Sequence, residues 1–301
     1  MLKLASVMHM KKNRVRGSLS LLLGTTIWGF SFIAQSVGMD HIGPFTFQAV
    51  RCLLAVLFLI PCAFVLDIGK CSFRESVAKW KNPALWRVGL ICGCALFVAS
   101  SLQQIGIVYT DAGKAGFITA MYIVLVPVLG LFLGKKPPRT TVFSVALAVV
   151  GLYLLCLAGR DTLSLTGGEW QLLLCAALFT LQIMLVNHFS PQLDGIQLSF
   201  MQFLVVAVLS TVFMFAFETP TIEQFRGAAV SIAYCGIMSS GVAYTLQIVG
   251  QKELDPTIAS LAMCLESVFS ALAGWLILGE TLSATESVSY THLTLPTNSR
   301  V

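Results

Sequence analysis

Two ionisable residues lie deep inside apolar stretches of the sequence. Glu266 follows Asp255 by 11 residues, about 16 Å along a helix, and Arg51 follows Pro44 by seven residues, about 10 Å. An ionised side chain at the centre of a membrane span costs about 2.5–3.5 kcal/mol on insertion scales. We therefore interpret Glu266 as a protonatable or solute-contacting group, and Arg51 as a contact for an anion or a carboxylate.

Each of these residues also has a purely structural interpretation. Glu266 could be a neutral carboxyl group that is hydrogen-bonded to a neighbouring helix, and Arg51 could bind the carbonyl groups at a helix end. Lys114 lies only three residues from Asp111, so its side chain can reach the membrane interface and is expected to act mainly as an anchor.

Several polar side chains recur at helical spacing within the apolar stretches. Such a face could line an aqueous path, or it could hold helices together through polar contacts worth about 0.6 kcal/mol each. We favour the first interpretation for Gln103 and Gln247 and leave both open for Trp28. The three faces comprise Ser240, Tyr244 and Gln247; Ser100 and Gln103; and Thr25, Trp28 and Gln35.

The elements that carry these residues are membrane spans. Hydrophobic residues make up 56% of the 301-residue chain and charged residues 11%, whereas soluble domains carry about 25% charged residues. Apolar stretches of about 20 residues recur, the length that crosses a bilayer. Nine spans are predicted: Ser18–Val37, Pro44–Leu66, Trp86–Ile107, Ala112–Leu133, Thr141–Leu157, Gly168–Asn187, Ile196–Phe217, Ala228–Gly250 and Pro256–Leu278.

The distribution of basic residues predicts the orientation. Of the Lys and Arg residues between spans, fourteen fall on the side of the N-terminus and two on the other, which places the basic segment 1–16 in the cytoplasm. These residues form no single basic face, so no nucleic-acid partner is expected. The nine cysteines lie mostly within apolar stretches, where we interpret them as inert, buried thiols.

The sequence repeats itself at an offset of 144 positions. Seven identities fall within 18 positions, where about one or two are expected by chance, and they include Gln103 with Gln247 and Gly106 with Gly250. Tyr122 is the repeat mate of Glu266. The two copies are five spans apart, and an odd number of spans predicts inverted topology with a binding site near the midplane.

Two stretches carry a family resemblance. Residues 110–122 (TDAGKAGFITAMY) with Pro127, and residues 265–280 (LESVFSALAGWLILGE), resemble the two signatures of EamA-type members of the drug/metabolite transporter superfamily, and Arg51 with the apolar run after it resembles the family's second helix. The resemblance implies ten helices in two inverted five-helix repeats. It assigns residues 17–158 to the first repeat and residues 167–286 to the second.

The end of the chain departs from that pattern. Residues 287–301 are too few and too polar to form a tenth span, and they resemble translated sequencing-adaptor read-through. We expect this tail to be an artefact in place of the tenth helix. A genuine nine-helix protein with a polar tail is the alternative. The predicted fold is therefore an all-α integral membrane protein with nine transmembrane helices present and the tenth missing.

These patterns predict a secondary transporter of the bacterial inner membrane that exports small metabolites, such as amino acids or drugs, by alternating access. The chain has no Walker loop, zinc motif or nucleophile elbow, so we expect neither an enzyme nor a cofactor. The expected partners are membrane lipid and a small-molecule solute, with a homodimer left open. The alternatives are a membrane-embedded enzyme and a membrane subunit without transport activity. The residues proposed to line the solute path are Trp28, Gln35, Arg51, Ser100, Gln103, Tyr122, Tyr244, Gln247 and Glu266.

Overall fold

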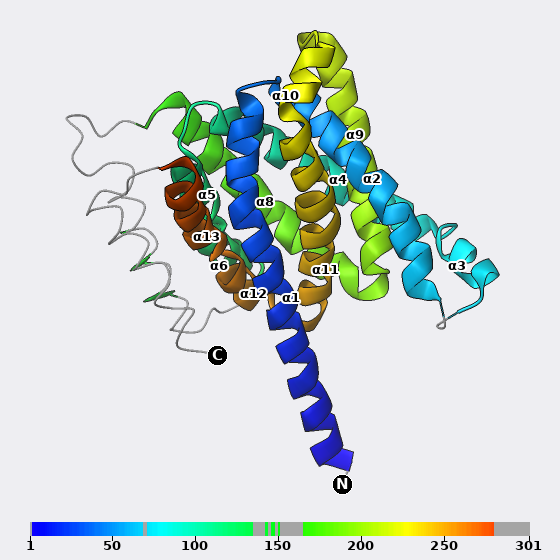
Figure 1. Cartoon of the computed structure of the whole chain (residues 1–301). Helices are drawn as coiled ribbons and strands as arrows, with labels where there is room; N and C mark the ends of the chain where they lie inside the picture. The colour runs from blue at the N-terminus through cyan, green and yellow to red at the C-terminus, as the bar shows by residue number, and fades with distance from the viewer. Residues whose placement is uncertain are drawn as a thin grey trace.

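The computed structural model describes residues 2–68, 71–134, 142–143, 146–147, 150 and 165–279, with side chains from residue 13 onward. These residues form an all-helical bundle without strands (Figure 1). The predicted all-α membrane fold is confirmed. The helices are α1 (Leu2–Met39), α2 (Pro44–Asp67), α3 (Phe73–Lys79), α4 (Pro83–Ile107), α5 (Ala112–Thr119), α6 (Tyr122–Phe132), α8 (Gly167–Phe189), η1 (Ser190–Gln192), α9 (Gly195–Phe217), α10 (Ile222–Ala233), η2 (Tyr234–Ala243), α11 (Tyr244–Glu253), α12 (Pro256–Met263), α13 (Glu266–Ala273) and η3 (Gly274–Leu278).

Eight segments of the described chain are long and apolar enough to cross a membrane, and they match eight of the nine predicted spans. The predicted fifth span, Thr141–Leu157, and the tail 287–301 lie outside the described residues, apart from a few positions of the former. The eight segments are Asn13–Met39, Pro44–Asp67, Pro83–Ile107, Ala112–Phe132, Gly167–Gln192, Gly195–Phe217, Ile222–Glu253 and Pro256–Leu278.

The helices begin at residues that satisfy free backbone N–H groups. Thr166 and Glu169 form a reciprocal capping box at the start of α8, and Ser72 and Glu75 form another at α3. The short α3 is also tied to the end of α2, because the Nζ atom of Lys79 lies 2.7 Å from a carboxylate oxygen of Asp67. This hydrogen bond raises the pKa of Lys79 above its usual value.

Two of the spans are divided by a tight turn that hydropathy did not predict. The turn between α5 and α6 is closed by hydrogen bonds from the N–H of Ile123 to the carbonyl of Ala120. The turn between α12 and α13 has the equivalent bond from Ser267 to Cys264, exactly 144 positions later. Each second half-helix therefore begins at the same repeat position, which is Tyr122 in one copy and Glu266 in the other.

Close backbone contacts also recur between the two copies. A Cβ atom added at Gly17 of α1 would lie 3.3 Å from the carbonyl oxygen of Gly250, and one added at Gly168 of α8 would lie 3.2 Å from that of Gly106. Gly106 and Gly250 are 144 positions apart, and Gly17 and Gly168 are 151 apart. The same helix crossing thus occurs twice, which supports the predicted repeat. The inverted direction of the copies stays a prediction.

The segment η2 interrupts the span Ile222–Glu253 with a stretch of π-helix. A Cβ atom added at Gly93 of α4 would lie 3.1 Å from the carbonyl oxygen of Gln202. A Cβ atom added at Gly236 of η2 would lie 2.9 Å from the carbonyl oxygen of Arg51. Gly93 and Gly236 are 143 positions apart, whereas the matching residues that follow them in the sequence, such as Gln103 and Gln247, are 144 positions apart. The second copy therefore holds one extra residue, which a π-helical turn accommodates within a helix.

The start of α2 gives a first testable prediction. The carboxylate of Glu218, at the end of α9, accepts hydrogen bonds from the N–H groups of Phe45 and Thr46 and from the Thr46 hydroxyl, at 2.9, 2.8 and 2.5 Å. We expect Glu218→Ala to lower the free energy of unfolding by about 1–2 kcal/mol, because these donors lose their acceptor. Thermal unfolding in detergent measures the effect. The neighbouring Thr219→Ala is the control, and equal stability of the two variants would contradict the prediction.

Candidate functional site

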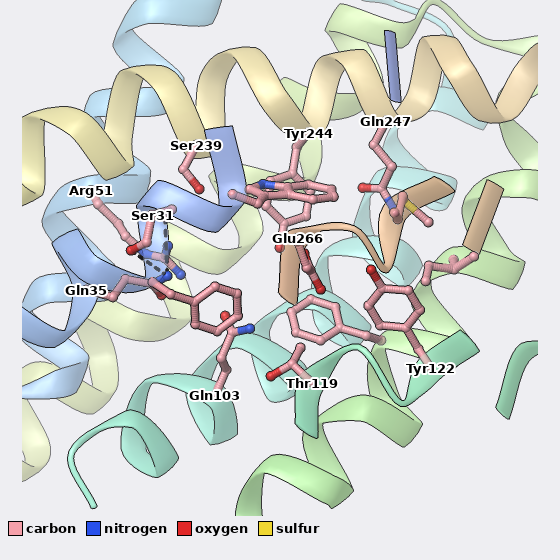
Figure 2. A pocket seen from close by; sticks show the side chains of 15 residues that line it. Ser31, Gln35, Arg51, Gln103, Thr119, Tyr122, Ser239, Tyr244, Gln247 and Glu266 are labelled. Atoms are coloured by element: carbon pink, nitrogen blue, oxygen red, sulfur yellow. Dashed lines mark hydrogen bonds between the residues drawn. The ribbon is translucent and has the colours of Figure 1, made fainter. Parts of the chain in front are cut away.

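A cavity of about 40 Å³ lies inside the bundle, large enough for a few water molecules, and polar and aromatic side chains line it together (Figure 2). Its walls come from α1, α2, α4, α5, α6, α8, η2, α11, α12 and α13, so both copies of the repeat contribute. The lining residues are Trp28, Ser31, Phe32, Gln35, Arg51, Gln103, Thr119, Tyr122, Phe179, Ile183, Ser239, Tyr244, Gln247, Met263 and Glu266.

The structure brings together eight of the nine residues proposed to line the path: Trp28, Gln35, Arg51, Gln103, Tyr122, Tyr244, Gln247 and Glu266. The ninth, Ser100, does not line this cavity. Its hydroxyl group donates a hydrogen bond to the carbonyl of Leu96, one turn earlier in α4, at 2.7 Å. This bond satisfies the hydroxyl within its own helix. We therefore omit Ser100 from the candidate site.

The lining residues follow the repeat. At the offset of 144, Gln103 pairs with Gln247 and Tyr122 with Glu266. At the offset of 151 that relates α1 to α8, Trp28 pairs with Phe179. The pairs in which both members line the cavity are Trp28 with Phe179, Phe32 with Ile183, Gln103 with Gln247, Thr119 with Met263, and Tyr122 with Glu266.

Glu266 and Arg51 are the charged residues of the cavity lining. Both are buried, with exposed fractions of 5% and 4%. No carboxylate lies within 4.0 Å of Arg51 among the described residues, and its Nε atom has no hydrogen-bond partner there. The Oε1 atom of Glu266 likewise has no partner. Figure 2 shows the two side chains in different parts of the cavity, with Arg51 near Ser31 and Gln35.

An aromatic pair covers one wall. The rings of Trp28 and Tyr244 meet edge to face, with centroids 4.8 Å apart, and Phe203 meets the other side of Tyr244 at 5.1 Å. The indole N–H of Trp28 has no hydrogen-bond acceptor among the described residues. With Phe32 and the aliphatic residues of the lining, this wall suits an apolar group, whereas the unpartnered donors and acceptors suit a polar one.

Sequence reasoning missed seven lining residues. Four of them are the apolar members of the repeat pairs: Phe32, Phe179, Ile183 and Met263. The offset of 151 would have identified Phe179 as the mate of Trp28, but its identities over residues 13–39 of α1 are only Gly17 with Gly168 and the leucine run 21–23 with 172–174, a match that leucine-rich spans readily give by chance. The other three are short hydroxyl residues, which are common as polar contacts in membrane helices and so give little signal: Ser31, Thr119 and Ser239.

A metal ion has no evident site in the part of the chain that the structure describes. Groups of three or more His, Cys, Asp or Glu side chains close enough to hold one do not occur there. The ionisable groups of the cavity lining, Glu266 and Arg51 among them, could instead move a proton or bind an ionic group of a solute.

A second polar hollow lies where α5 and α8 begin, lined by residues that include Ser36, Thr110 and Thr166. Here the Nζ atom of Lys114 lies 3.1 Å from the Glu169 carboxylate, whose side chain is 2% exposed. Lys114 is therefore more than an interface anchor, because it connects a helix of the first copy to one of the second.

This ion pair gives a second prediction. We expect Lys114→Met to lower the free energy of unfolding by about 3 kcal/mol, because it removes a cation that lies 3.1 Å from the buried carboxylate of Glu169. The double variant Lys114→Met with Glu169→Gln is expected to regain part of this loss, since the buried negative charge is then removed together with the cation. Thermal unfolding in detergent compares the three proteins. A single variant as stable as the unmodified protein would contradict the assigned pairing.

Comparisons with known proteins agree with this fold. The EamA-like transporter family matches residues 15–157 and 166–290. An uncharacterized transporter of Archaeoglobus fulgidus is 29% identical over 90% of this chain and 80% of its own. The uncharacterized transporter YoaV of Bacillus subtilis is 25% identical over 89% and 91%, and the chloroplastic WAT1-related protein At3g02690 of Arabidopsis thaliana is 26% identical over 87% and 63%. A solved crystal structure superposes with a TM-score of 0.73 over 93% of this chain and 95% of its own, at 16% identity.

Proposed function

This chain belongs to the EamA-like transporter family, and we propose that it exports a small metabolite, such as an amino acid or a drug-like compound, through the cavity between its two halves. The family and the transporter names of its relatives make it a membrane transporter in general terms. The class of solute, the outward direction and alternating access are the proposal.

The observation that carries the proposal is the chemistry of the cavity. Polar side chains of both halves converge on one enclosed space, and several of their atoms have no partner among the described residues. These atoms include Nε of Arg51 and Oε1 of Gln35, Gln247 and Glu266. An unpartnered buried polar group costs about 1–3 kcal/mol. A polar solute that entered the cavity would relieve several such penalties at once.

The helix breaks give this cavity a means to open. Tight turns at Ala120 and Cys264 divide two spans close to the positions of Tyr122 and Glu266. Discontinuous helices of this kind form the midplane sites of other inverted-repeat transporters. We propose that the half-helices α6 and α13 move against α5 and α12 as the cavity alternates between the two sides of the membrane.

Glu266 is our candidate for energy coupling. It is the carboxyl group of the cavity lining, and its side chain is almost fully buried. Protonation removes the charge whose burial is costly, so proton binding and release would change the energy of the site during the cycle. A proton or an exchanged solute would then drive export.

The remaining assignments complete the proposal. The first half is residues 17–158 and the second is residues 167–286. The basic segment 1–16 faces the cytoplasm of a bacterium, the chain lies in the inner membrane, and a homodimer is left open. A membrane enzyme would instead need acidic or histidine residues clustered at one interface, and the acidic residues that the structure describes are dispersed. A subunit without transport activity would show neither flux nor turnover.

Flux into proteoliposomes tests the proposed function. Purified protein is reconstituted, and uptake of labelled amino acids and amphiphilic drugs is compared with that of protein-free vesicles under an imposed pH gradient. We expect saturable uptake of at least one solute. Absence of flux for every solute, together with catalytic turnover of a lipid, would favour the enzyme alternative.

A further inference from the structure

Three equivalent positions of the repeat make different contacts in the two halves. In the first half they hold Ser31, Arg51 and Gln103, which all line the cavity. In the second half they hold Gln182 and Gln202, each 151 positions later, and Gln247, which is 144 positions later. We call these sets the first triad and the second triad. The first carries a charge and the second is neutral.

The members of the second triad are joined by two hydrogen bonds, while Nε2 of Gln202 and Oε1 of Gln247 have no partner among the described residues. The side-chain amide of Gln182 donates to the carbonyl oxygen of Gln202 at 3.1 Å, and the amide of Gln247 donates to the carbonyl oxygen of Gln182 at 3.3 Å. Gln182 and Gln202 are fully buried, and neither lines the cavity. The amide groups therefore bind one another, and only Gln247 also reaches the cavity.

The first triad is open. Arg51 has neither a carboxylate partner nor an acceptor for its Nε atom among the described residues. Ser31 accepts a bond from the amide of Gln35 at 3.3 Å, which holds Gln35 beside the triad. Figure 2 shows Arg51, Ser31 and Gln35 together at one end of the cavity, away from Tyr122 and Gln247.

An open guanidinium group at the end of a cavity selects for an oxyanion. The planar fork of arginine matches a carboxylate through two parallel hydrogen bonds, and such charge-assisted bonds are stronger than neutral ones. An arginine buried without a counter-charge is costly, so a bound anion would stabilise the site as well as the ligand. Glu266 lies elsewhere in the cavity and forms no ion pair with Arg51.

We propose that the first triad binds the carboxylate group of the transported solute. The solute then binds in one orientation, with its carboxylate at Arg51 and its apolar part against the wall of Trp28, Tyr244 and Phe179. This inference rests on the proposed function, because it concerns the same cavity.

Binding of two matched probes tests the inference. The probes 3-phenylpropanoate and 3-phenylpropanamide differ only in the carboxylate, and their affinities for the purified full-length protein are measured by calorimetry in detergent. We expect the carboxylate to bind at least about tenfold more tightly than the amide. Arg51→Gln should abolish this preference while binding of the amide changes little, and Arg51→Lys should keep part of it, because it retains the charge but not the fork.

The repeat supplies the matched control. Gln202→Leu removes a hydrogen-bond acceptor of the second triad, so it should lower the unfolding temperature but leave the preference for the carboxylate unchanged. Equal binding of the two probes by the unmodified protein, or binding of neither, would contradict the inference. The inference would also be contradicted if the Arg51→Gln variant were folded, as judged by its melting curve, and still bound the carboxylate probe more tightly than the amide probe. Failure of the proposed function is a separate result, namely the absence of solute flux in proteoliposomes.

Discussion

Replacement of Glu266 by glutamine is expected to lower proton-driven flux at least about tenfold and to remove its dependence on pH. Glutamine resembles the protonated carboxyl group in shape but cannot release a proton, so the variant is held in one state of the coupling cycle. Initial rates of solute uptake into proteoliposomes, measured across a range of pH values with and without an imposed pH gradient, give the result.

The control for this variant is Glu223→Gln, which removes an exposed carboxyl group at the start of α10. It should leave both the rate and its pH dependence unchanged. Solute exchange without a net proton movement is a useful second assay, because a glutamine at position 266 is compatible with exchange. A Glu266→Gln protein with unaltered pH-dependent transport would remove this residue from the mechanism.

A large expected effect on stability follows from Gly29, where α1 packs closely against α13. A Cβ atom at this position would lie 2.3 Å from Cβ of Phe269, and 2.9 Å from both the Phe269 carbonyl carbon and the Ser270 nitrogen. Two of these three atoms belong to the backbone, so a change of side-chain rotamer cannot relieve the clash. We expect Gly29→Ala to lower the free energy of unfolding by about 3 kcal/mol, at the upper end of overpacking effects.

Gly167, the first residue of α8, provides the matched control, because no atom lies within 4 Å of an added Cβ there. Gly167→Ala is expected to change stability by less than about 1 kcal/mol, since it adds only helix propensity near a helix end. Melting curves of the two variants in the same detergent make the comparison. A Gly29→Ala protein that melts together with the control would show that the contact between α1 and α13 is looser than described.

Much of the fold could be predicted from the sequence, because the bilayer imposes a length and a composition on every span. Hydropathy located eight spans that the structure also shows, and the identities at an offset of 144 related Gln103 to Gln247 and Tyr122 to Glu266. Those four side chains do line one cavity. Polar residues in an apolar stretch must face protein or water, which explains why these four converge; that they contact a transported solute stays a prediction.

The helix breaks could not be predicted, because a tight turn of three or four residues leaves the hydropathy of a span unchanged. Pro127 in α6 is compatible with such a break, but α13 has an alanine, Ala271, at the equivalent position. The sequence also did not predict the hydrogen bonds that join Gln182, Gln202 and Gln247 in the second triad. A buried glutamine such as Gln182 has the same local sequence signal whether it faces a cavity or another amide, so only the packing of α8 against α9 and α11 distinguishes the two cases.

Ser100 lies outside the cavity lining. Its spacing from Gln103 placed both residues on one helical face, but a serine hydroxyl can bond to its own helix and so has no need of a polar neighbour. The larger amide of Gln103 cannot be satisfied in that way as readily, and it is this side chain that reaches the cavity. Side-chain length therefore decides which polar residues of a face contribute to the site.

The central claim is that a transported solute occupies the cavity between the two halves. Chemical labelling of a Thr119→Cys variant tests it most directly, because Thr119 lines the cavity and lies beside the break that precedes Tyr122. A small water-soluble thiol reagent is applied to proteoliposomes, and labelling is read as the increment over the native cysteines. We predict that position 119 reacts and that a transported solute slows the reaction in proportion to its occupancy. Labelling that is absent, or that is unaffected by saturating solute, would contradict the account.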